Sequence, residues 1–313
     1  KNCVYVDKTR LVHQLATTGT YYFFSRPRRF GKSLWLSVLQ HYYDINRKDE
    51  FDALFTGTYI GTHPTAERNS YLIMFLNFAA VNPEPDKVQA SFEDNGRAVV
   101  EDFLIRYRTY FDGEKQSEVL AVPTLEGQLR RIFFHAQREK LKIYLLIDEY
   151  DNFSNTILAT AGEQAYHDLT HGGGFFRHFF NLLKSATAGQ TSGLGRLFIT
   201  GVSPITLDDV SSGFNIGTNL SLDARLNEMI GFTEAEVRTL LDYYLDVGLL
   251  PLPVDECLAL MREWYNNYHF GRRAPTSMFN SDMVLYFLLR TEADNGVPLD
   301  LIDQNIRIDY GKL

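Results

Sequence analysis

Cysteine is scarce in this sequence, which contains only Cys3 and Cys257 among its 313 residues. Two cysteines so far apart support neither a disulfide framework nor a zinc site. Long apolar runs are also missing: none reaches the roughly 18 residues that a membrane span needs, and no segment has the pattern of a signal peptide. These absences predict a cytoplasmic protein with no membrane partner. Because the first residue is Lys1 rather than Met, we expect a fragment of a longer protein.

An excess of positive charge is lacking as well, since the formal net charge is −8. This balance argues against a protein that coats nucleic acid generally. We find neither an internal repeat nor a low-complexity segment. Apolar residues make up 45% of the chain and charged residues 22%, which is typical of globular proteins. The length is sufficient for one large α/β domain and a smaller one.

The most informative segment lies near the start of the chain. Residues Tyr21–Ser25 are aromatic-rich and predict a buried strand, and a short basic turn, Arg26–Gly31, follows them. The next residues, Lys32 and Ser33, open an apolar pattern of helical spacing. A strand, a turn, Gly-Lys-Ser and a helix, in this order, are the context of a phosphate-binding P-loop, the Walker A motif.

The chemistry of phosphate binding explains these residue types. Backbone N–H groups at a helix N-terminus attract anionic oxygens, so we expect the cofactor-binding residues to be Arg28, Arg29, Phe30, Gly31, Lys32, Ser33 and Leu34. In this hypothesis Lys32 contacts the β- and γ-phosphates of ATP, and Ser33 is a ligand of Mg²⁺. The full motif has Gly where Arg26 stands. On this segment alone, an ordinary basic turn between a strand and a helix remains the alternative.

An acidic pair downstream supplies the second half of a nucleotide site. The apolar run Ile143–Ile147 predicts a buried strand, and Asp148 and Glu149 follow it directly. In a P-loop ATPase such a Walker B pair holds Mg²⁺ through the first carboxylate, while the second orients and deprotonates the attacking water. Charges commonly follow buried strands, so the pair alone leaves the assignment open. Together with Gly31-Lys32-Ser33, it predicts an ATPase.

The order of the predicted strands indicates the fold class. One strand, Tyr71–Phe78, lies between the P-loop strand and the acidic strand, and another, Arg196–Thr200, follows them. This is the layout of α/β additional-strand P-loop ATPases, whose ligands bind at the carboxyl ends of a parallel sheet. Thr200 is then the expected sensor of the γ-phosphate and a catalytic residue, with Ser203 as the alternative. We expect the core at residues 1–231 and a helical lid at residues 232–313.

Weaker patterns concern the remaining segments. Helical spacing predicts helices within residues 84–140 and 175–188, and three more at 233–247, 255–268 and 281–291. The polar, glycine-rich residues 155–174 predict an exposed loop. Arg225 and Arg238 are candidates for an arginine finger or a lid sensor, although single arginines are usually surface residues.

Several motifs follow one another in an order that resembles a known family. They are Tyr5-Val6-Asp7-Lys8-Thr9, Ser25 to Ser33, Leu146-Ile147-Asp148-Glu149-Tyr150-Asp151, Thr200-Gly201-Val202-Ser203-Pro204, Ser212-Gly213-Phe214-Asn215 and Gly231-Phe232-Thr233. The chain resembles the AAA-ATPase-like family of uncharacterised, mostly bacterial proteins, whose longer members carry a C-terminal restriction-type nuclease domain. In that family Arg occupies the position of Arg26. The resemblance implies a strand order of 5-1-4-3-2, with strand 5 near Asn227 to Ile230.

The sequence therefore predicts Mg²⁺-dependent ATP binding and hydrolysis, which drive a conformational switch. The catalytic residues are Lys32, Glu149 and Thr200, and Ser33 and Asp148 hold the metal. The alternative is a nucleotide-binding regulatory or scaffold module that hydrolyses negligibly and gates a partner or a nuclease effector. Expected partners are ATP, a second copy or another protein. Nucleic acid is expected only through a nuclease domain, whose Glu-x-Lys signature has no convincing counterpart in this chain.

Overall fold

The computed structural model describes residues 5–187, 192–203, 217–250, 252–266, 268–271, 273–294 and 296–302. The chain divides into two compact units. The sheet unit contains residues 12–27 and 36–220, and the helical unit contains residues 1–11, 28–35 and 221–313. The predicted boundary between residues 231 and 232 stays a prediction.

The sheet unit is built on five parallel strands in the order β2-β3-β4-β1-β5. Their bounds are β1 (Tyr21–Ser25), β2 (Leu72–Asn77), β3 (Ile143–Asp148), β4 (Leu194–Gly201) and β5 (Thr218–Asn219). The α/β fold class and the strand order 5-1-4-3-2 are thereby confirmed. Four of the strands also lie where continuous apolar runs predict them, as strands buried on both faces do.

The expected position of the fifth strand was wrong. The segment expected to form it, Asn227 to Ile230, follows a short 3₁₀ helix, η3 (Ala224–Leu226), whereas β5 pairs with β1 through Tyr22 and Thr218. Asn227 is buried, and its side-chain amide donates a hydrogen bond to the carbonyl oxygen of Thr276 at 3.0 Å. The real strand has two exposed polar residues, so no apolar run marks it in the sequence.

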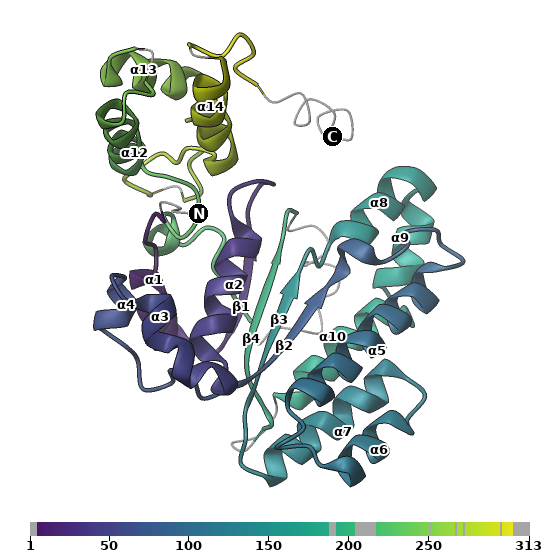
Figure 1. Ribbon diagram of the computed structural model, residues 1–313. Coiled ribbons are helices and arrows are strands. Elements are labelled where there is room, and N and C mark those ends of the chain that lie inside the picture. Colours follow the sequence, from purple (N-terminus) through teal and green to yellow (C-terminus); the bar gives the residue numbers. More distant parts are fainter. Residues whose placement is uncertain are drawn as a thin grey trace. The chain divides into compact units, whose positions relative to one another are not determined.

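Helices cover both faces of the sheet (Figure 1). The helical segments that begin in or lie within the sheet unit are η1 (Ile45–Glu50), α3 (Phe51–Phe55), α4 (Tyr59–Thr62), η2 (Phe78–Ala80), α5 (Val88–Arg106), α6 (Gly113–Leu120), α7 (Leu125–Arg138), α8 (Asn152–Ala161), α9 (Glu163–Thr170) and α10 (Phe175–Ala186). Two further helices, α1 (Arg10–Thr18) and α2 (Lys32–Tyr43), contain residues of both units. A parallel sheet needs this double cover because both of its faces are apolar.

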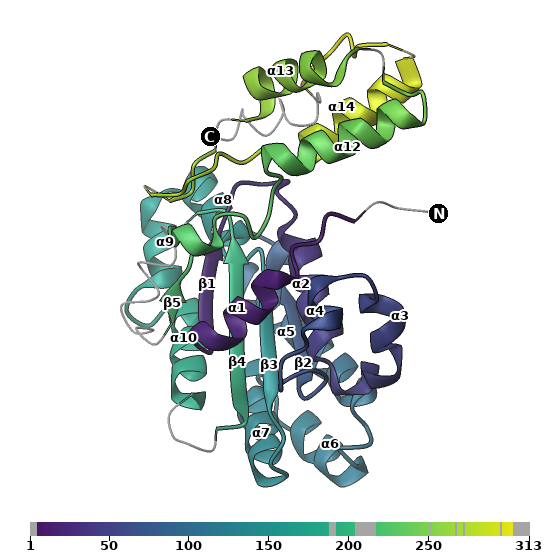
Figure 2. The same cartoon turned by 90° about the vertical axis from the view of Figure 1, so that its left-hand side faces the viewer.

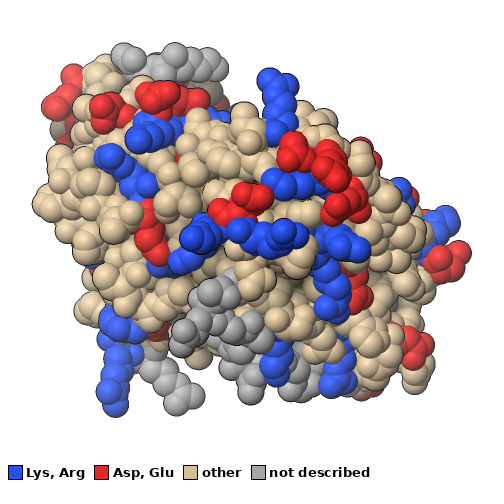
Figure 3. All heavy atoms as spheres, turned by 90° about the horizontal axis from the view of Figure 1, so that it is seen from below, with Lys and Arg blue, Asp and Glu red and all other residues tan. Residues whose placement is uncertain are grey.

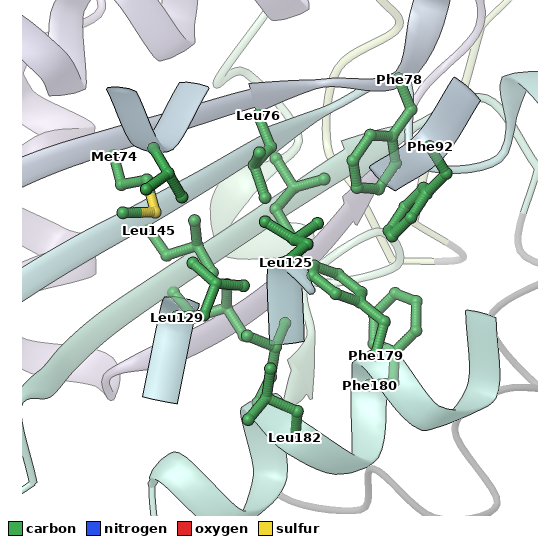
Figure 4. Close-up of a cluster of buried hydrophobic side chains, with 14 of the residues drawn as sticks. Met74, Leu76, Phe78, Phe92, Leu125, Leu129, Leu145, Phe179, Phe180 and Leu182 are labelled. Carbon is green, nitrogen blue, oxygen red and sulfur yellow. The ribbon is translucent and has the colours of Figure 1, made fainter. Parts of the chain in front are cut away.

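Alternate strand residues define the two faces of the sheet. On one face, Met74, Leu76 and Leu145 pack with Leu129 of α7 and Phe179 of α10 in the large core cluster (Figure 4). On the other face, Figure 2 shows α1 and α2 against the strands. There the ring of Tyr43 in α2 lies 5.1 Å from that of Tyr144 in β3. Tyr22 of β1 donates a hydrogen bond to the carbonyl oxygen of Leu15 in α1 at 2.7 Å.

The expectation of a loop at residues 155–174 was wrong, because α8 and α9 occupy most of it. Gly162, with a φ of +86°, separates the two helices, and Gly172, with a φ of +53°, follows α9. Ile157, Tyr166 and Leu169 are buried in the large core cluster. Burial of these three apolar side chains therefore stabilises α8 and α9, which the polar composition of the segment did not reveal.

The C-terminal helices have a core of their own. They are α12 (Glu234–Asp246), α13 (Val254–Tyr265) and α14 (Ser281–Asp294), close to the three predicted helices. Thr233 and Glu236 form a capping box at the start of α12, in which each side chain accepts a hydrogen bond from the other's backbone N–H. Lys8 forms an ion pair with Glu236, which joins the N-terminal segment to this unit.

Charged side chains of both signs lie interspersed on the face seen in Figure 3. Helices α5 to α7 carry several ion pairs, namely Arg106–Asp102 at 2.5 Å, Lys115–Glu139 at 2.9 Å and Arg130–Glu126 at 2.7 Å. At least one side chain of each pair is exposed to solvent, so each pair contributes little to stability.

We predict that Leu145→Ala lowers the free energy of unfolding by about 2–5 kcal/mol, because it leaves a cavity in a close-packed core. Leu145 is fully buried, whereas Leu120 at the end of α6 has 45% of its surface exposed. The control, Leu120→Ala, removes the same atoms and is expected to change stability by less than about 1 kcal/mol. Urea unfolding followed by circular dichroism measures both. Equal losses would contradict the assigned core.

Candidate functional site

The carboxyl ends of three neighbouring strands lie at one edge of the sheet. Ser25, the last residue of β1, pairs with Gly201 at the end of β4. On the other side of β4, Ile199 pairs with Ile147, one residue before Asp148 at the end of β3. Segments that leave these three strands therefore start side by side, at the edge where open α/β sheets bind ligands.

The predicted P-loop has the expected local structure. β1 ends at Ser25 and α2 begins at Lys32, so the turn between them spans residues 26–31. Gly31 has a φ of +93°, in the left-handed region that favours glycine, and its carbonyl oxygen accepts a hydrogen bond from the N–H of Trp35 at 3.0 Å. Arg29 also lies in the left-handed region, with a φ of +68°. The strand, turn and helix thus follow one another as the sequence predicts.

Exposure differs along this turn and the first turn of α2. Phe30 and Lys32 are buried, with 1% and 5% of their surfaces exposed. Ser33 and Leu34 are exposed, and so is Arg28. Residues 28–35 make most of their contacts within the helical unit and belong to it. Asp148, Glu149 and Thr200 belong to the sheet unit. The assigned nucleotide-binding and metal-binding roles of all these residues stay predictions.

Arg26 stands where the full P-loop motif has its first glycine, and the structure shows why an arginine fits there. Its backbone N–H donates to the carbonyl oxygen of Gly201 at 3.1 Å, which extends the pairing of β1 with β4. The guanidinium group is buried, lies 4.3 Å from the ring centroid of Phe24, and donates to the carbonyl oxygen of Ser25 at 3.0 Å. Burial lowers the pKa of Arg26 to about 9, so the group is still charged at neutral pH.

The predicted acidic pair lies at the end of β3. Asp148 is buried, and its Oδ1 accepts a hydrogen bond from the N–H of Glu149 at 3.0 Å. Glu149 is half-buried and has a φ of +52°. A left-handed backbone is strained for a non-glycine residue by on the order of 1–3 kcal/mol, and such strain concentrates at functional sites.

The role of Asp151 was not predicted from the sequence. This side chain is 1% exposed, and it accepts hydrogen bonds from the N–H groups of Val202 at 3.1 Å and Ser203 at 2.5 Å. It therefore joins the segment after β3 to the segment after β4. In the sequence, its only signal is a third acidic residue shortly after Asp148 and Glu149.

The two candidates for the phosphate sensor are held differently. The hydroxyl of Thr200 is buried and donates to the carbonyl oxygen of Phe24 at 2.8 Å. Ser203 is half-buried, and its carbonyl oxygen accepts a hydrogen bond from the Tyr150 hydroxyl at 2.5 Å. The assignment of Thr200 as sensor stays a prediction. Pro204 and the motif Ser212-Gly213-Phe214-Asn215 lie outside the described residues.

The remaining candidates have ordinary surroundings. Arg225 forms an ion pair with Asp223 at 2.6 Å, and Arg238 forms one with Asp255 at 2.8 Å. Within the residues that the structure describes, no group of three or more His, Cys, Asp or Glu side chains could hold a metal ion. In the same part of the chain, no helix is both long enough and apolar enough to cross a membrane.

The parallel sheet, its strand order and the Gly-Lys-Ser turn after β1 define the additional-strand class of P-loop fold. A model of the family described as "Predicted AAA-ATPase" matches residues 1–211, and the chain belongs to this family. This confirms the resemblance seen in the sequence motifs.

The chain is also similar to individual proteins. One is described as an uncharacterized protein in the vnfD 5′ region of Azotobacter chroococcum mcd 1, which is 28% identical over 305 residues. The alignment covers 96% of this chain and 52% of that protein, so the chain spans about half the length of this curated relative. The other is the crystal structure of Cdc6p from Pyrobaculum aerophilum, with 13% identity and a TM-score of 0.46 over 92% of this chain and 60% of that one.

We predict that Gly31→Ala destabilises the protein by about 1–2 kcal/mol, because alanine is strained at a φ of +93°. A methyl group at this position meets only the Oγ of Ser281, at 3.9 Å, so a steric clash does not contribute. The matched control is Gly113→Ala, which is also free of contacts but has no positive φ. It is expected to be neutral or stabilising. Thermal unfolding of the two variants tests this, and equal shifts would refute the strain.

We predict that Asp151→Ala lowers the free energy of unfolding by about 1–3 kcal/mol, because it leaves the N–H groups of the half-buried residues Val202 and Ser203 without this acceptor. Asp151→Asn retains one acceptor oxygen and is expected to lose about half as much. The measurement is urea unfolding of both variants and the wild type. A loss under about 0.5 kcal/mol in Asp151→Ala would show that this carboxylate does not join the two segments.

Proposed function

We propose that this chain binds Mg²⁺-ATP and hydrolyses it, and that hydrolysis drives a conformational switch. One observation carries the proposal: the turn that leads to Lys32, the acidic pair Asp148-Glu149 and Thr200 all start from one edge of a parallel sheet. This edge is where open α/β sheets bind ligands, and membership of the predicted AAA-ATPase family supports a nucleotide as the ligand.

The residues present fit a magnesium nucleotide. Mg²⁺ prefers oxygen ligands and usually takes only one or two from the protein, with phosphate and water supplying the others. Asp148 provides a carboxylate at the end of β3, and Ser33 provides an exposed hydroxyl in the first turn of α2. Because a dedicated protein cage is not required, two such ligands are sufficient. When bound, the ion would neutralise part of the negative charge of the phosphates.

The remaining roles follow from position and charge. The Nζ of Lys32 neutralises the γ-phosphate, and the backbone N–H groups of the turn bind the phosphate oxygens. Glu149 accepts a proton from the attacking water, whose oxygen forms a bond to the γ-phosphorus as the bond to ADP breaks. The strained backbone of Glu149 supports this role, because strain of this kind is retained where it aims a side chain.

A second candidate function is a nucleotide-binding module that hydrolyses ATP negligibly and gates a partner. The hydrogen bond from Thr200 to Phe24 favours it, because this hydroxyl donates to β1 rather than being free to donate to a phosphate. The two candidates differ in turnover, not in binding. A substitution of Glu149 distinguishes the two candidate functions, since only an enzyme needs a base at this position.

We predict that Lys32→Ala abolishes ATP binding and turnover, whereas Glu149→Gln lowers the turnover rate by at least about 100-fold and preserves binding. Phosphate release with Mg²⁺-ATP measures turnover, and calorimetry measures binding. The control is Glu84→Gln, which changes an exposed glutamate paired with Lys87 and should alter neither.

The outcomes separate the two candidates. Turnover that is lost in Glu149→Gln, with binding intact, supports the ATPase and its base. Binding without turnover in the wild type supports the gating module. An absence of binding in the wild type would refute a nucleotide site.

A further inference from the structure

The phosphate-binding turn packs with the C-terminal helices in one compact unit. Residues 28–35, which include Gly31-Lys32-Ser33, belong to the helical unit together with residues 221–313. The turn itself, residues 26–31, follows directly after β1 of the sheet unit in the sequence. Contacts with the segments around α12 and α14 hold the conformation of this turn.

Hydrogen bonds from segments far along the chain hold the backbone of the turn. The carbonyl oxygen of Arg29 accepts from the N–H of Asp282 at 3.3 Å and from the hydroxyl of Ser281 at 3.2 Å. The carbonyl oxygen of Phe30 accepts from the N–H of Gly231 at 3.0 Å. All three donors lie more than 190 residues further along the chain, at the start of α14 and just before α12. The first two residues of α14 thus contact the turn directly.

The side chain of Phe30 is enclosed by the same unit. Its ring centroid lies 4.7 Å from that of Tyr268 and 5.2 Å from that of Phe270, both in edge-to-face geometry. Gly231 approaches so closely that a Cβ atom there would lie 2.8 Å from the Phe30 ring. Because the side chain is 1% exposed, its packing restrains the turn as well as its own rotamer.

The conformation that these contacts hold is a strained one. Arg29 has a φ of +68°, which a non-glycine residue retains only when its surroundings enforce it. Its guanidinium group forms an ion pair with the carboxylate of Asp282 at 3.2 Å. Asp282 is itself fixed, because the Oδ1 of Asn280 accepts a hydrogen bond from its N–H at 3.1 Å. Asp282 therefore holds Arg29 by both its backbone and its side chain.

We propose that the start of α14, chiefly Ser281 and Asp282, positions the phosphate-binding turn and so sets the affinity for ATP. The inference rests on the proposed nucleotide site and deepens it. Ser281 and Asp282 are positioning residues, since they act through Arg29 and Phe30 rather than on the phosphates. The coupling is reciprocal: whatever displaces the start of α14 weakens ATP binding, and bound ATP resists that displacement.

The test is a double-mutant cycle on the affinity of the whole chain for Mg²⁺-ATP, measured by calorimetry. The variants are Arg29→Gln, Asp282→Asn and the two combined. We expect Asp282→Asn to weaken binding by about twofold to fivefold, the upper part of the range for one partly exposed ion pair. The combined variant should be no weaker than the weaker single variant, because either change removes the same interaction. Ser281→Ala, which deletes a single hydroxyl, should weaken binding in the same direction.

A matched ion pair in the same unit provides the control. Arg238 and Asp255 also form an exposed pair, away from the turn in sequence, and Asp255→Asn should leave the affinity within about twofold. Unchanged or tighter binding in both Asp282→Asn and Ser281→Ala would overturn the inference. So would additive losses in the cycle, which would show that Arg29 acts on the phosphates independently of Asp282. Failure of the wild type to bind Mg²⁺-ATP would instead refute the proposed function, and the inference with it.

Discussion

The pairing of β1 with β4 is the interaction on which the candidate site depends. Ser25 pairs with Gly201 at the carboxyl ends of these strands, and the N–H of Arg26 extends the pairing by one more hydrogen bond. The Thr200 hydroxyl adds a bond to Phe24 from the side chain. Because Asp151 joins the segments after β3 and β4, a third strand end is fixed to the same two. The turn, the acidic pair and the sensor candidates all start from this arrangement.

Two of the predicted site residues have a strained backbone. Glu149 and Arg29 each have a left-handed backbone, and each is held by local contacts in a different unit. The N–H of Glu149 donates to Asp148, and its carbonyl oxygen accepts from the N–H of Asn152, in the sheet unit. Arg29 is held by Asp282 in the helical unit. Each strained backbone is therefore enforced by contacts within its own unit.

The sequence predicted much of the fold, but fewer of the contacts that hold the candidate site in place. Continuous apolar runs marked β1 to β4 because both sheet faces are buried, and the family resemblance supplied their order. Strand β5 and helices α8 and α9 were missed, since two exposed polar residues carry no strand signal and glycines near Gly162 and Gly172 suggested a loop. The role of Asp151 was also missed, because its hydrogen-bond partner Val202 lies 51 residues further along the chain. Such a long-range contact leaves no local pattern in the sequence.

The backbone geometry of the turn after β1 explains why an arginine can occupy the first glycine position of the P-loop motif. Glycine is favoured where φ is positive, and in this turn the positive values fall at Arg29 and Gly31, not at Arg26. At Arg26 the backbone still pairs with β4, so a side chain is tolerated. That side chain carries a buried positive charge, whose removal from water is unfavourable. The carbonyl oxygen of Ser25 and the ring of Phe24 offset part of that penalty, so the fold accommodates an arginine at a position where the full P-loop motif has glycine.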